Sequence, residues 1–477
     1  MNRISINRYL GVAGIAFVFS ACAPSLVNKT ADVSTMPEHY SALQDTTNTA
    51  KIQWKDYFTD PYLNALIDTA IANNQELNIT LQEIVIANNE VRARKGEYLP
   101  FVGVKGAAGV EKVGRYTSQG ANDANTEIMP GKEFPEPLPD YMVGVVANWE
   151  LDIWRKLRNA KKSALMQYLS TVEGKNFMVT NLIAEIANSY YELLALDNQL
   201  VIVKKNIDIL NDALVIVRMQ KQAAQVTELA VRRFEAEVLK NESRQYYIQQ
   251  HIVETENHIN FLVGRYPQPV QRDYQTFNDL VPSTIHTGIP AQLLANRPDI
   301  RQAEMKLAAA NLDIKVAKAR FYPSVGISAG IGFQAFNPSY LIKTPASLLY
   351  SLAGDLTAPL INRNAIKAAY YSANAQQIQA VYHYEQTILN AYVEVANQVS
   401  MITNLELSYN LKSRQVQALT ESIDVANVLF RSARADYMEV LLTQREALES
   451  KFELIETKKQ QMNAVVNMYQ ALGGGWR

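Results

Sequence analysis

The sequence has one cysteine, five histidines and, after its first thirty residues, no run of apolar residues long enough to span a bilayer as a helix. A single cysteine excludes an intramolecular disulfide framework and a zinc site built from cysteines. The histidines lack His-Glu-x-x-His spacing, and neither a phosphate-binding glycine loop nor a Gly-x-Ser-x-Gly motif occurs. The net charge of −1 gives no electrostatic basis for binding nucleic acid. We therefore expect no catalytic residues, no cofactor, no metal site and no nucleic-acid partner.

The N-terminus has the pattern of an export signal. Arg3 and Arg8 precede an apolar run at residues 10–19, which is too short to span a bilayer, and small residues then lead to Cys22. We predict a lipoprotein signal peptide at 1–21 and acylation of Cys22. The alternative is an ordinary signal peptide in which Cys22 is incidental, and Phe19 stands where the lipoprotein motif usually has leucine. Because no further transmembrane helix is predicted, a mature chain that crosses a membrane would need a closed barrel.

Glycine and proline are missing from two long stretches. No glycine occurs within 175–263 or 355–472, and no proline within 140–266 or after Pro359. Both residues are costly inside helices, so these stretches are helix candidates. Apolar residues recur there at steps of three and four, as in Leu193, Leu196, Leu200, Val203, Ile207, Leu210, Leu214 and Val217. This heptad spacing predicts coiled coils, and a helix over 156–222 would be about 100 Å long.

Glycine and proline instead concentrate around four segments of about ten residues. These segments predict strands at about 100–111, 141–153, 323–334 and 349–361. Their length is the length that a tilted membrane strand needs.

The chain also contains an internal repeat. A constant shift aligns 74–109 with 297–332 without a gap. Past the predicted loop the shift becomes smaller and lays 158–160 on 363–365, so the loop between the strands is shorter in the second pair. A third shift brings Val231 onto Val440 and Leu239 onto Leu448. Each half is predicted to contain a helix, two strands and a long helical hairpin.

The predicted fold is mainly α with a β-barrel portion. Its parts are a signal peptide at 1–21, an N-terminal extended segment at 22–60, a first repeat at 61–265 with its helical hairpin at 156–265, a linker at 266–290, a second repeat at 291–472 with its hairpin at 363–472, and a glycine-rich tail at 473–477. Four strands cannot close a barrel alone, because an open edge in lipid leaves backbone groups without hydrogen bonds. Three chains would supply twelve strands, so we predict a homotrimer.

Three stretches carry a resemblance to a known family. They are Arg297-Pro298-Asp299-Ile300-Arg301-Gln302-Ala303-Glu304, Ala319-Arg320-Phe321-Tyr322-Pro323-Ser324 and Ala471-Leu472-Gly473-Gly474-Gly475-Trp476. Together with the repeat and the Cys22 motif, they make the chain similar to the outer-membrane efflux lipoproteins of RND pumps, the NodT type within the TolC superfamily. The resemblance covers essentially the whole mature chain.

The resemblance implies a TolC-like twelve-stranded barrel in the lipid of the outer membrane, continuous with a periplasmic α-barrel. Such a channel is the exit duct of a tripartite efflux pump and passes drugs or other small toxic compounds from the periplasm to the exterior. The implied partners are a periplasmic adaptor protein and an inner-membrane RND transporter. The alternatives are the exit duct of a type I protein secretion system or a structural periplasmic coiled-coil lipoprotein.

The Arg297-Pro298-Asp299 motif has a physical interpretation of its own. Pro298 suits a first helical turn, where its missing N–H costs nothing, and Asp299 complements the helix dipole. We interpret the three residues as a structural motif that starts a helix and packs it, and not as a binding site. We expect the glycines at 473–475 to end the last helix and free the tail.

The tips of the two hairpins are the expected docking points of the adaptor. They are predicted at Ala223-Ala224-Gln225 and at Ser432-Ala433-Arg434. Relatives usually have a glycine at these tips and this chain has none, so either alanine tolerates the turn or the tip geometry differs.

Three residues near the second tip are candidates for a pore gate. Asp424 matches a position where related channels can carry an acidic residue that faces the pore, and the alternative is a solvated aspartate on the outer face. Arg431 and Arg434 could tie the tips together through charge-assisted bonds to carboxylates such as Asp436 or Glu439.

Overall fold

The computed structural model describes residues 23–27, 29–32, 36–38, 40, 47–280, 286–359, 361, 363–432 and 434–476. The predicted signal peptide and Cys22 lie outside the described residues. Within those ranges, no helix is both long and apolar enough to cross a membrane. The chain divides into two compact units, one built mainly from Val85–Leu169 and Met305–Val381, the other from Ala31–Ile84, Ser170–Glu304 and Tyr382–Arg477.

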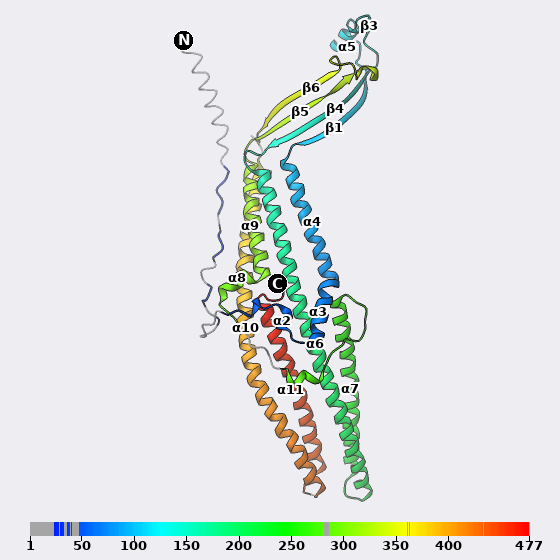
Figure 1. Ribbon diagram of the computed structural model, residues 1–477, viewed down its shortest axis with the longest axis vertical. Coiled ribbons are helices and arrows are strands. Elements are labelled where there is room, and N and C mark those ends of the chain that lie inside the picture. The colour runs from blue at the N-terminus through cyan, green and yellow to red at the C-terminus, as the bar shows by residue number, and fades with distance from the viewer. Residues whose placement is uncertain are drawn as a thin grey trace. The chain divides into compact units, whose positions relative to one another are not determined.

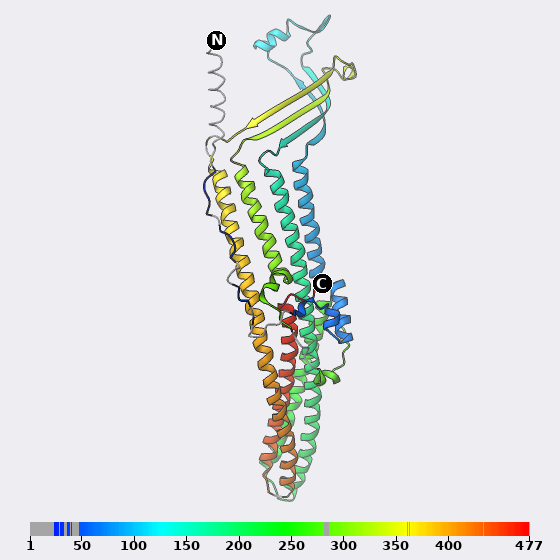
Figure 2. The same cartoon turned by 60° about the vertical axis from the view of Figure 1, so that its left-hand side comes forward.

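The first unit contains a four-stranded antiparallel sheet in the order β1-β4-β5-β6 (Figures 1 and 2). The strands are β1 (Phe101–Glu111), β4 (Leu138–Leu151), β5 (Ser324–Ala335) and β6 (Leu348–Thr357). Val145 of β4 lies opposite Val104 of β1 on one side and Ile331 of β5 on the other. Each predicted strand segment therefore contains an observed strand, with its ends moved by a few residues.

The two faces of this sheet differ in polarity. Residues that are directly paired point to the same face, and residues alternate between faces along each strand. By this register, one face carries apolar side chains, among them Val102, Val104, Val143, Val145, Trp149, Ile327, Ile331, Leu352 and Leu356. The other face carries every charged residue of the four strands: Lys105, Glu111, Asp140, Glu150 and Asp355.

Local contacts agree with this assignment of faces. Gln334 Nε2 donates to Asp140 Oδ2 at 2.8 Å across the sheet. The Asp355 carboxylate lies over Gly326, its partner on β5, where a Cβ atom would have no room. The sheet therefore has one apolar and one polar surface.

The connections between the strands are unequal, as the change of shift predicts. The β1–β4 connection holds α5 (Ser118–Asp123) and a small sheet of β2 (Glu127–Met129) and β3 (Lys132–Glu133). The β5–β6 connection holds only the single turn η4 (Pro338–Tyr340). The elements of the first connection were not predicted, because short polar segments carry little periodicity.

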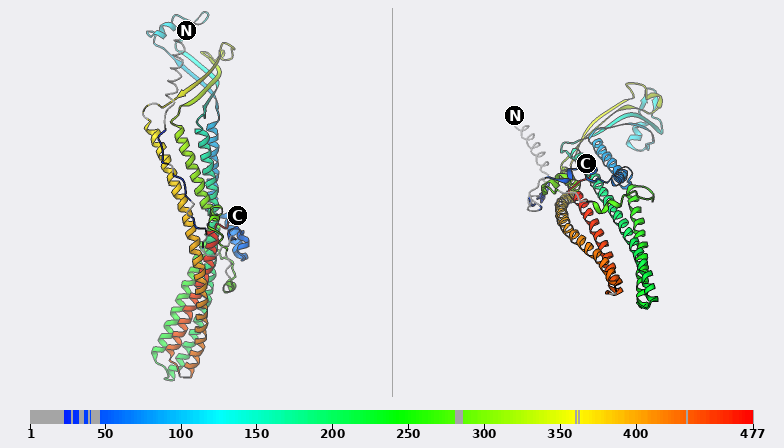
Figure 3. Two further views of the ribbon diagram at one scale, coloured as in Figure 1. Left: turned by 90° about the vertical axis from the view of Figure 1, so that its left-hand side faces the viewer. Right: turned by 60° about the horizontal axis from the view of Figure 1, so that its bottom comes forward.

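Long helices flank the strands in the order of the chain. They are α4 (Gln75–Tyr98) and α6 (Lys156–Gln222), then α7 (Glu228–Val263), α9 (Pro298–Ala319), α10 (Asn364–Arg431) and α11 (Tyr437–Ala471). The longest, α6 and α10, have 67 and 68 residues. Both helices lack proline and α10 also lacks glycine, whereas α6 includes Gly174 near its start. Figure 3 shows the hairpins α6–α7 and α10–α11 in two further views.

The second unit contains the main apolar core. The predicted stripe of α6 is buried except for the partly buried Leu200, with Leu193, Val203 and Val217 almost inaccessible to solvent. Residues from α3 (Pro61–Asn73), α6, α7 and α11 form one cluster around Leu63, Ile67, Ile186 and Tyr190. The segment predicted to be extended contributes α2 (Trp54–Tyr57), because Trp54 and Tyr57, one turn apart, pack into this cluster. The short helix α8 (Leu293–Asn296) and the single turns η1 (Thr49–Lys51), η2 (Gln275–Asp279) and η3 (Pro290–Gln292) complete the described elements.

Candidate functional sites at the motif junction and the hairpin tips

Arg297 is the centre of a buried junction of three helices. The residue is only 5% exposed and directly precedes α9. Its guanidinium donates to both Asp299 oxygens at 3.0 and 2.7 Å, to Glu394 Oε2 of α10 at 2.6 Å and to the carbonyl of Ala471 in α11 at 2.8 Å. Burial lowers the pKa of Arg297, but hydrogen bonds and charge from the two carboxylates outweigh it and raise the pKa overall. The motif therefore joins α9, α10 and α11.

The glycine-rich end of the chain is packed into this junction, so the expectation that it frees the tail is wrong. Gly473 has a φ of +86°, and a Cβ atom there would lie 2.7 Å from the carbonyl oxygen of Asn296. Trp476 Nε1 donates to that same carbonyl at 3.1 Å. Its ring lies beneath Arg301, whose guanidinium also pairs with Glu173 at 2.6 Å. Close backbone approach, and not chain freedom, explains the glycine here.

The first hairpin tip shows that alanine tolerates the turn. Ala224 has a φ of +59°, in the left-handed region. The amide of Gln225 donates to the Gln220 carbonyl and the amide of Ala224 to the Lys221 carbonyl, both at 2.9 Å. This pattern is a Schellman motif at the end of α6, a position that usually holds glycine. Ala223 and Gln225 are exposed beside it.

The second tip makes the corresponding hydrogen bonds. The amide of Arg434 donates to the Leu429 carbonyl at 2.9 Å, which is the counterpart, in the internal repeat, of the Gln225–Gln220 bond. Ser432 donates to the Val428 carbonyl at 3.1 Å. Ala433 lies outside the described residues.

The two tips differ in charge pairing. At the first tip, Lys221 pairs with Glu228 and Arg218 with Glu235, the latter at 2.8 Å, so α6 is bonded to α7 twice. Arg232 links the two glutamates at 2.8 and 3.0 Å. Hydrogen bonds from Lys221 and from Arg218 lower the pKa of Glu228 and of Glu235, respectively.

The gate candidates of the second tip are exposed in the single chain. In the described part of the chain, no carboxylate pairs with Arg431 or Arg434. Asp436 instead accepts a hydrogen bond from the Met438 amide at 3.4 Å and caps α11. The tie to Asp436 or Glu439 is therefore not made within one chain. Asp424 is exposed, and its place in a pore remains a prediction about the assembled channel.

Among the described residues, no cluster of three or more histidine, cysteine, aspartate or glutamate side chains could hold a metal ion.

Comparison with known proteins identifies the class. The family model described as outer membrane efflux protein matches residues 66–265 and 289–474. The pyoverdine export outer membrane protein OpmQ of Pseudomonas aeruginosa is 25% identical over 425 residues, 89% of this chain and 88% of that protein. The solvent efflux pump outer membrane protein SrpC of Pseudomonas putida is 27% identical over 435 residues, 90% of this chain and 88% of that protein.

The fold is that of solved outer-membrane channels. The open-state structure of the MtrE outer membrane channel of Neisseria gonorrhoeae superposes with a TM-score of 0.82 at 22% identity, over 96% of this chain and 99% of that chain. The protein is thus a TolC-like outer-membrane channel protein in fold. It belongs to the outer membrane efflux protein family, and the outer-membrane efflux function predicted from the sequence is confirmed.

Proposed function

We propose that this protein is the trimeric exit duct of a tripartite RND-type efflux pump, anchored in the outer membrane by an acylated Cys22. The observation that carries the proposal is the two-faced sheet, whose outer edges β1 and β6 pair with no further strand among the described residues. An apolar face suits contact with lipid, and a polar face suits a water-filled passage. Unpaired edges in lipid must be closed, and three copies give a barrel of twelve strands.

Burial in the helices supports assembly independently. Leu239 and Tyr246 of α7 are 64% and 69% exposed. In the internal repeat they correspond to Leu448 and Ile455 of α11, which are 6% and 4% exposed because they pack against α6 and its neighbours. If the two halves are equivalent, the face of α7 that carries Leu239 and Tyr246 packs against a second copy of the chain, in the way that α11 packs against α6 within one chain.

The charges on the polar face of the sheet suggest which charge of cargo the duct favours. Lys105 is the single basic residue of that face, against Glu111, Asp140, Glu150 and Asp355. Lys156 pairs with Glu150 and offsets one of these acids. Rings of carboxylates around a passage favour cations. We infer a duct that passes cationic and neutral compounds more readily than anions.

The start of the described chain supports the lipid anchor. Ala23 and Leu26 are partly buried against the cluster of Phe321 and Tyr370. Phe321 lies three residues before β5, so Ala23 is held near the first residues of the strands. Cys22 precedes Ala23 directly, and its acyl chains would enter the membrane at this level.

The proposed partners are a periplasmic adaptor, which docks at the hairpin tips, and an inner-membrane RND transporter. The two relatives differ in what they export, pyoverdine for OpmQ and solvents for SrpC, so the proposed cargo is the broad class of small toxic compounds.

The test is co-expression with adaptor and transporter in a strain that lacks its own outer-membrane efflux channels. We expect resistance to at least one toxic compound to require all three proteins. Equal resistance with the channel omitted would refute the proposal. Cys22→Ala should abolish labelling with palmitate, and persistent labelling would refute the anchor.

A further inference from the structure

Four helices meet the four-stranded sheet at one of its ends (Figures 1 and 2). Phe101, the first residue of β1, lies opposite Asn148 near the end of β4, and Ser324 of β5 lies opposite Thr357 of β6. The helices α4 and α9 therefore end at the same level at which α6 and α10 begin, all within the first unit.

This level of the chain is strongly basic. Residues 90–98, 152–162, 313–320 and 363–367 hold thirteen lysines and arginines but only four aspartates and glutamates, in a chain whose net charge is −1. These bases form what we name the basic collar: Arg92, Arg94, Lys95, Arg155, Lys156, Arg158, Lys161, Lys162, Lys315, Lys318, Arg320, Arg363 and Lys367.

The basic collar is confined to its level along three of the helices. In α4, no lysine or arginine precedes Arg92. In α10, none occurs between Lys367 and Lys412, and in α6 none occurs between Lys162 and Lys175. The four strands on the other side of the collar contain a single basic residue. The positive charge is thus a layer across four helices, and not a stripe along one of them.

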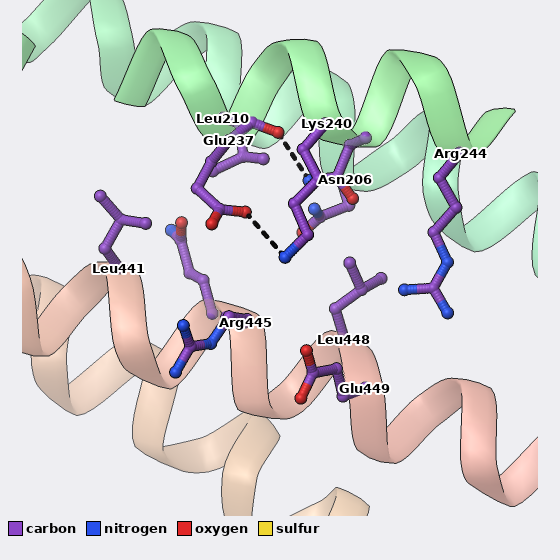
Figure 4. A pocket seen from close by; sticks show the side chains of 11 residues that line it. Asn206, Leu210, Glu237, Lys240, Arg244, Leu441, Arg445, Leu448 and Glu449 are labelled. Atoms are coloured by element: carbon purple, nitrogen blue, oxygen red, sulfur yellow. Dashed lines mark hydrogen bonds and ion pairs between the residues drawn. The ribbon is translucent and has the colours of Figure 1, made fainter. Parts of the chain in front are cut away.

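Elsewhere on the helices, bases lie among acids. At a small cavity between α6, α7 and α11, the bases Lys240, Arg244 and Arg445 are interspersed with Glu237 and Glu449 (Figure 4). Lys240 Nζ lies 3.7 Å from Glu237 Oε2. The surface there balances its charges locally, whereas the basic collar does not.

Local contacts account for only four of the collar bases. Arg94, Lys156 and Arg158 pair with carboxylates, and Arg363 donates to the Phe321 carbonyl at 3.2 Å. Among the residues that the structure describes, the other nine collar bases have no carboxylate at ion-pair distance, and all of them except the half-buried Lys161 are exposed. The helix dipole favours acids at the start of a helix, yet neither α6 nor α10 has one in its first turn.

Aromatic side chains lie at the same level. Trp154 stacks on Tyr322, with ring centroids 4.7 Å apart. Trp149, on the apolar face of the sheet, donates from Nε1 to the carbonyl of Tyr98 at the end of α4, at 3.2 Å. Tryptophan and tyrosine gather where the wall of a membrane barrel leaves the hydrocarbon. Ala23, next to the proposed lipid anchor, packs at this level as well.

We propose that the basic collar binds the anionic headgroups of phospholipids in the periplasmic leaflet of the outer membrane. A leaflet presents its phosphates as a layer at one level, in the same way that the collar presents its bases. Each lysine or arginine near an anionic membrane surface strengthens binding about fivefold, so several together would hold the channel at a fixed depth. The inference rests on the proposed barrel, because a chain that spans the membrane brings its collar to the surface of that leaflet.

Native mass spectrometry of the purified full-length protein tests the collar. The protein is mixed with equal amounts of phosphatidylglycerol, which is anionic, and phosphatidylcholine, which has no net charge, with matched acyl chains. We expect the trimer to retain phosphatidylglycerol at least about fivefold more than phosphatidylcholine, the effect of one base on one headgroup. Lys162→Gln, Lys318→Gln and Arg320→Gln together should reduce this preference at least about twofold. Lys162→Arg and Lys318→Arg together keep the charge and should keep the preference.

The matched control removes two lysines and one arginine from exposed positions of α6 and α10 outside the collar, by Lys204→Gln, Lys205→Gln and Arg414→Gln. It should leave the lipid preference unchanged. A trimer that retains both lipids equally would overturn the collar, as would a collar variant that behaves like the control. If the collar variant instead raises the preference of single channels for potassium over chloride, the bases face the passage and the inference is wrong. A protein that forms no trimer would refute the proposed duct itself.

Discussion

Asn74 and Arg297, which occupy equivalent positions in the internal repeat, make the same hydrogen bond in the two halves of the chain. Asn74 Nδ2 donates to the carbonyl of Leu262 at 2.8 Å, and Arg297 Nη1 donates to that of Ala471 at 2.8 Å. The two acceptors are equivalent as well, under the shift that relates the two returning helices. Each donor therefore binds an otherwise unpaired carbonyl at the end of a long helix.

The glycines beside these carbonyls correspond in the same way. Gly264 and Gly473 both have positive φ, and a Cβ atom on either would lie within 2.7 Å of a backbone oxygen, that of Asn73 or of Asn296. Arg297 goes beyond its counterpart, because it also binds Asp299 and Glu394. The second half thus has a charged junction at the place where the first half has only the contact of an amide.

The first prediction concerns this junction. Arg297→Ala leaves the largely buried Asp299 carboxylate without its partner, so we expect thermal unfolding to show a loss of about 3–5 kcal/mol. Arg297→Asn provides the same side-chain amide as Asn74, so this variant should lose less of the free energy of unfolding than Arg297→Ala. Arg434→Ala, at an exposed arginine, is the control and should change stability by less than about 0.5 kcal/mol. Equal stability of Arg297→Ala and the control would show that the junction contributes nothing.

The second prediction concerns the left-handed alanine. Ala224→Gly removes the steric penalty of φ +59° and should stabilise the first hairpin by roughly 0.5–1 kcal/mol, measured by hydrogen exchange near the tip. Ala236→Gly, at an exposed position inside α7, should instead destabilise by about 1 kcal/mol. Destabilisation by both changes would mean that the left-handed turn is not present in solution.

The third prediction concerns pH at the first tip. The folded-state pKa values of Glu228 and Glu235 are lowered. Their contribution to the stability of the hairpin tip is therefore complete above the unfolded-state pKa of about 4.3, and it is lost as the pH falls through the folded-state pKa values. Backbone amide hydrogen exchange at residues 218–235 should therefore become faster in acid, after the rates are corrected for the intrinsic pH dependence of exchange. Glu235→Gln should reduce this pH dependence. A tip that opens equally at pH 6 and pH 3.5 would contradict the ion-pair network.

The fourth prediction concerns the charged residues on the polar face of the sheet. Asp140→Asn and Asp355→Asn together should reduce the preference of single channels for potassium over chloride by about twofold or more, because they neutralise the polar face of the sheet. Lys105→Gln should increase that preference. No change in either variant would place this face outside the conducting path.

The fifth prediction concerns the gate. If Asp424 faces the axis of a trimer, Asp424→Ala should remove block by divalent cations, and Arg431→Ala should raise the open probability. Both are read from single-channel currents in planar bilayers. Unchanged ion selectivity and unchanged divalent block in Asp424→Ala would place this aspartate on the outer face.

The sequence predicts the long helices and the strands well, for physical reasons that individual residues show. Leu193 to Val217 repeat at heptad spacing, and such a stripe can be buried in only one way, against other helices. The strands are bounded by glycine and proline and alternate apolar with polar or small residues.

Contacts between distant residues were not predictable in this way. Arg297 binds Glu394 and Ala471, which are 97 and 174 positions away in the sequence. The residues next to Arg297 therefore indicate the start of a helix but not these two contacts. The repeat did contain a usable signal, because it sets Arg297 against Asn74. The docking of Trp476 under Arg301 has no local sequence signal.

The central claim, that three copies close the unpaired edges β1 and β6 into one duct, is tested most directly by native mass spectrometry of the purified protein in detergent. We predict a single species with the mass of three mature chains, and a trimer that survives Asp424→Ala and Arg431→Ala. A folded species with the mass of one chain, stable without detergent, would contradict the account.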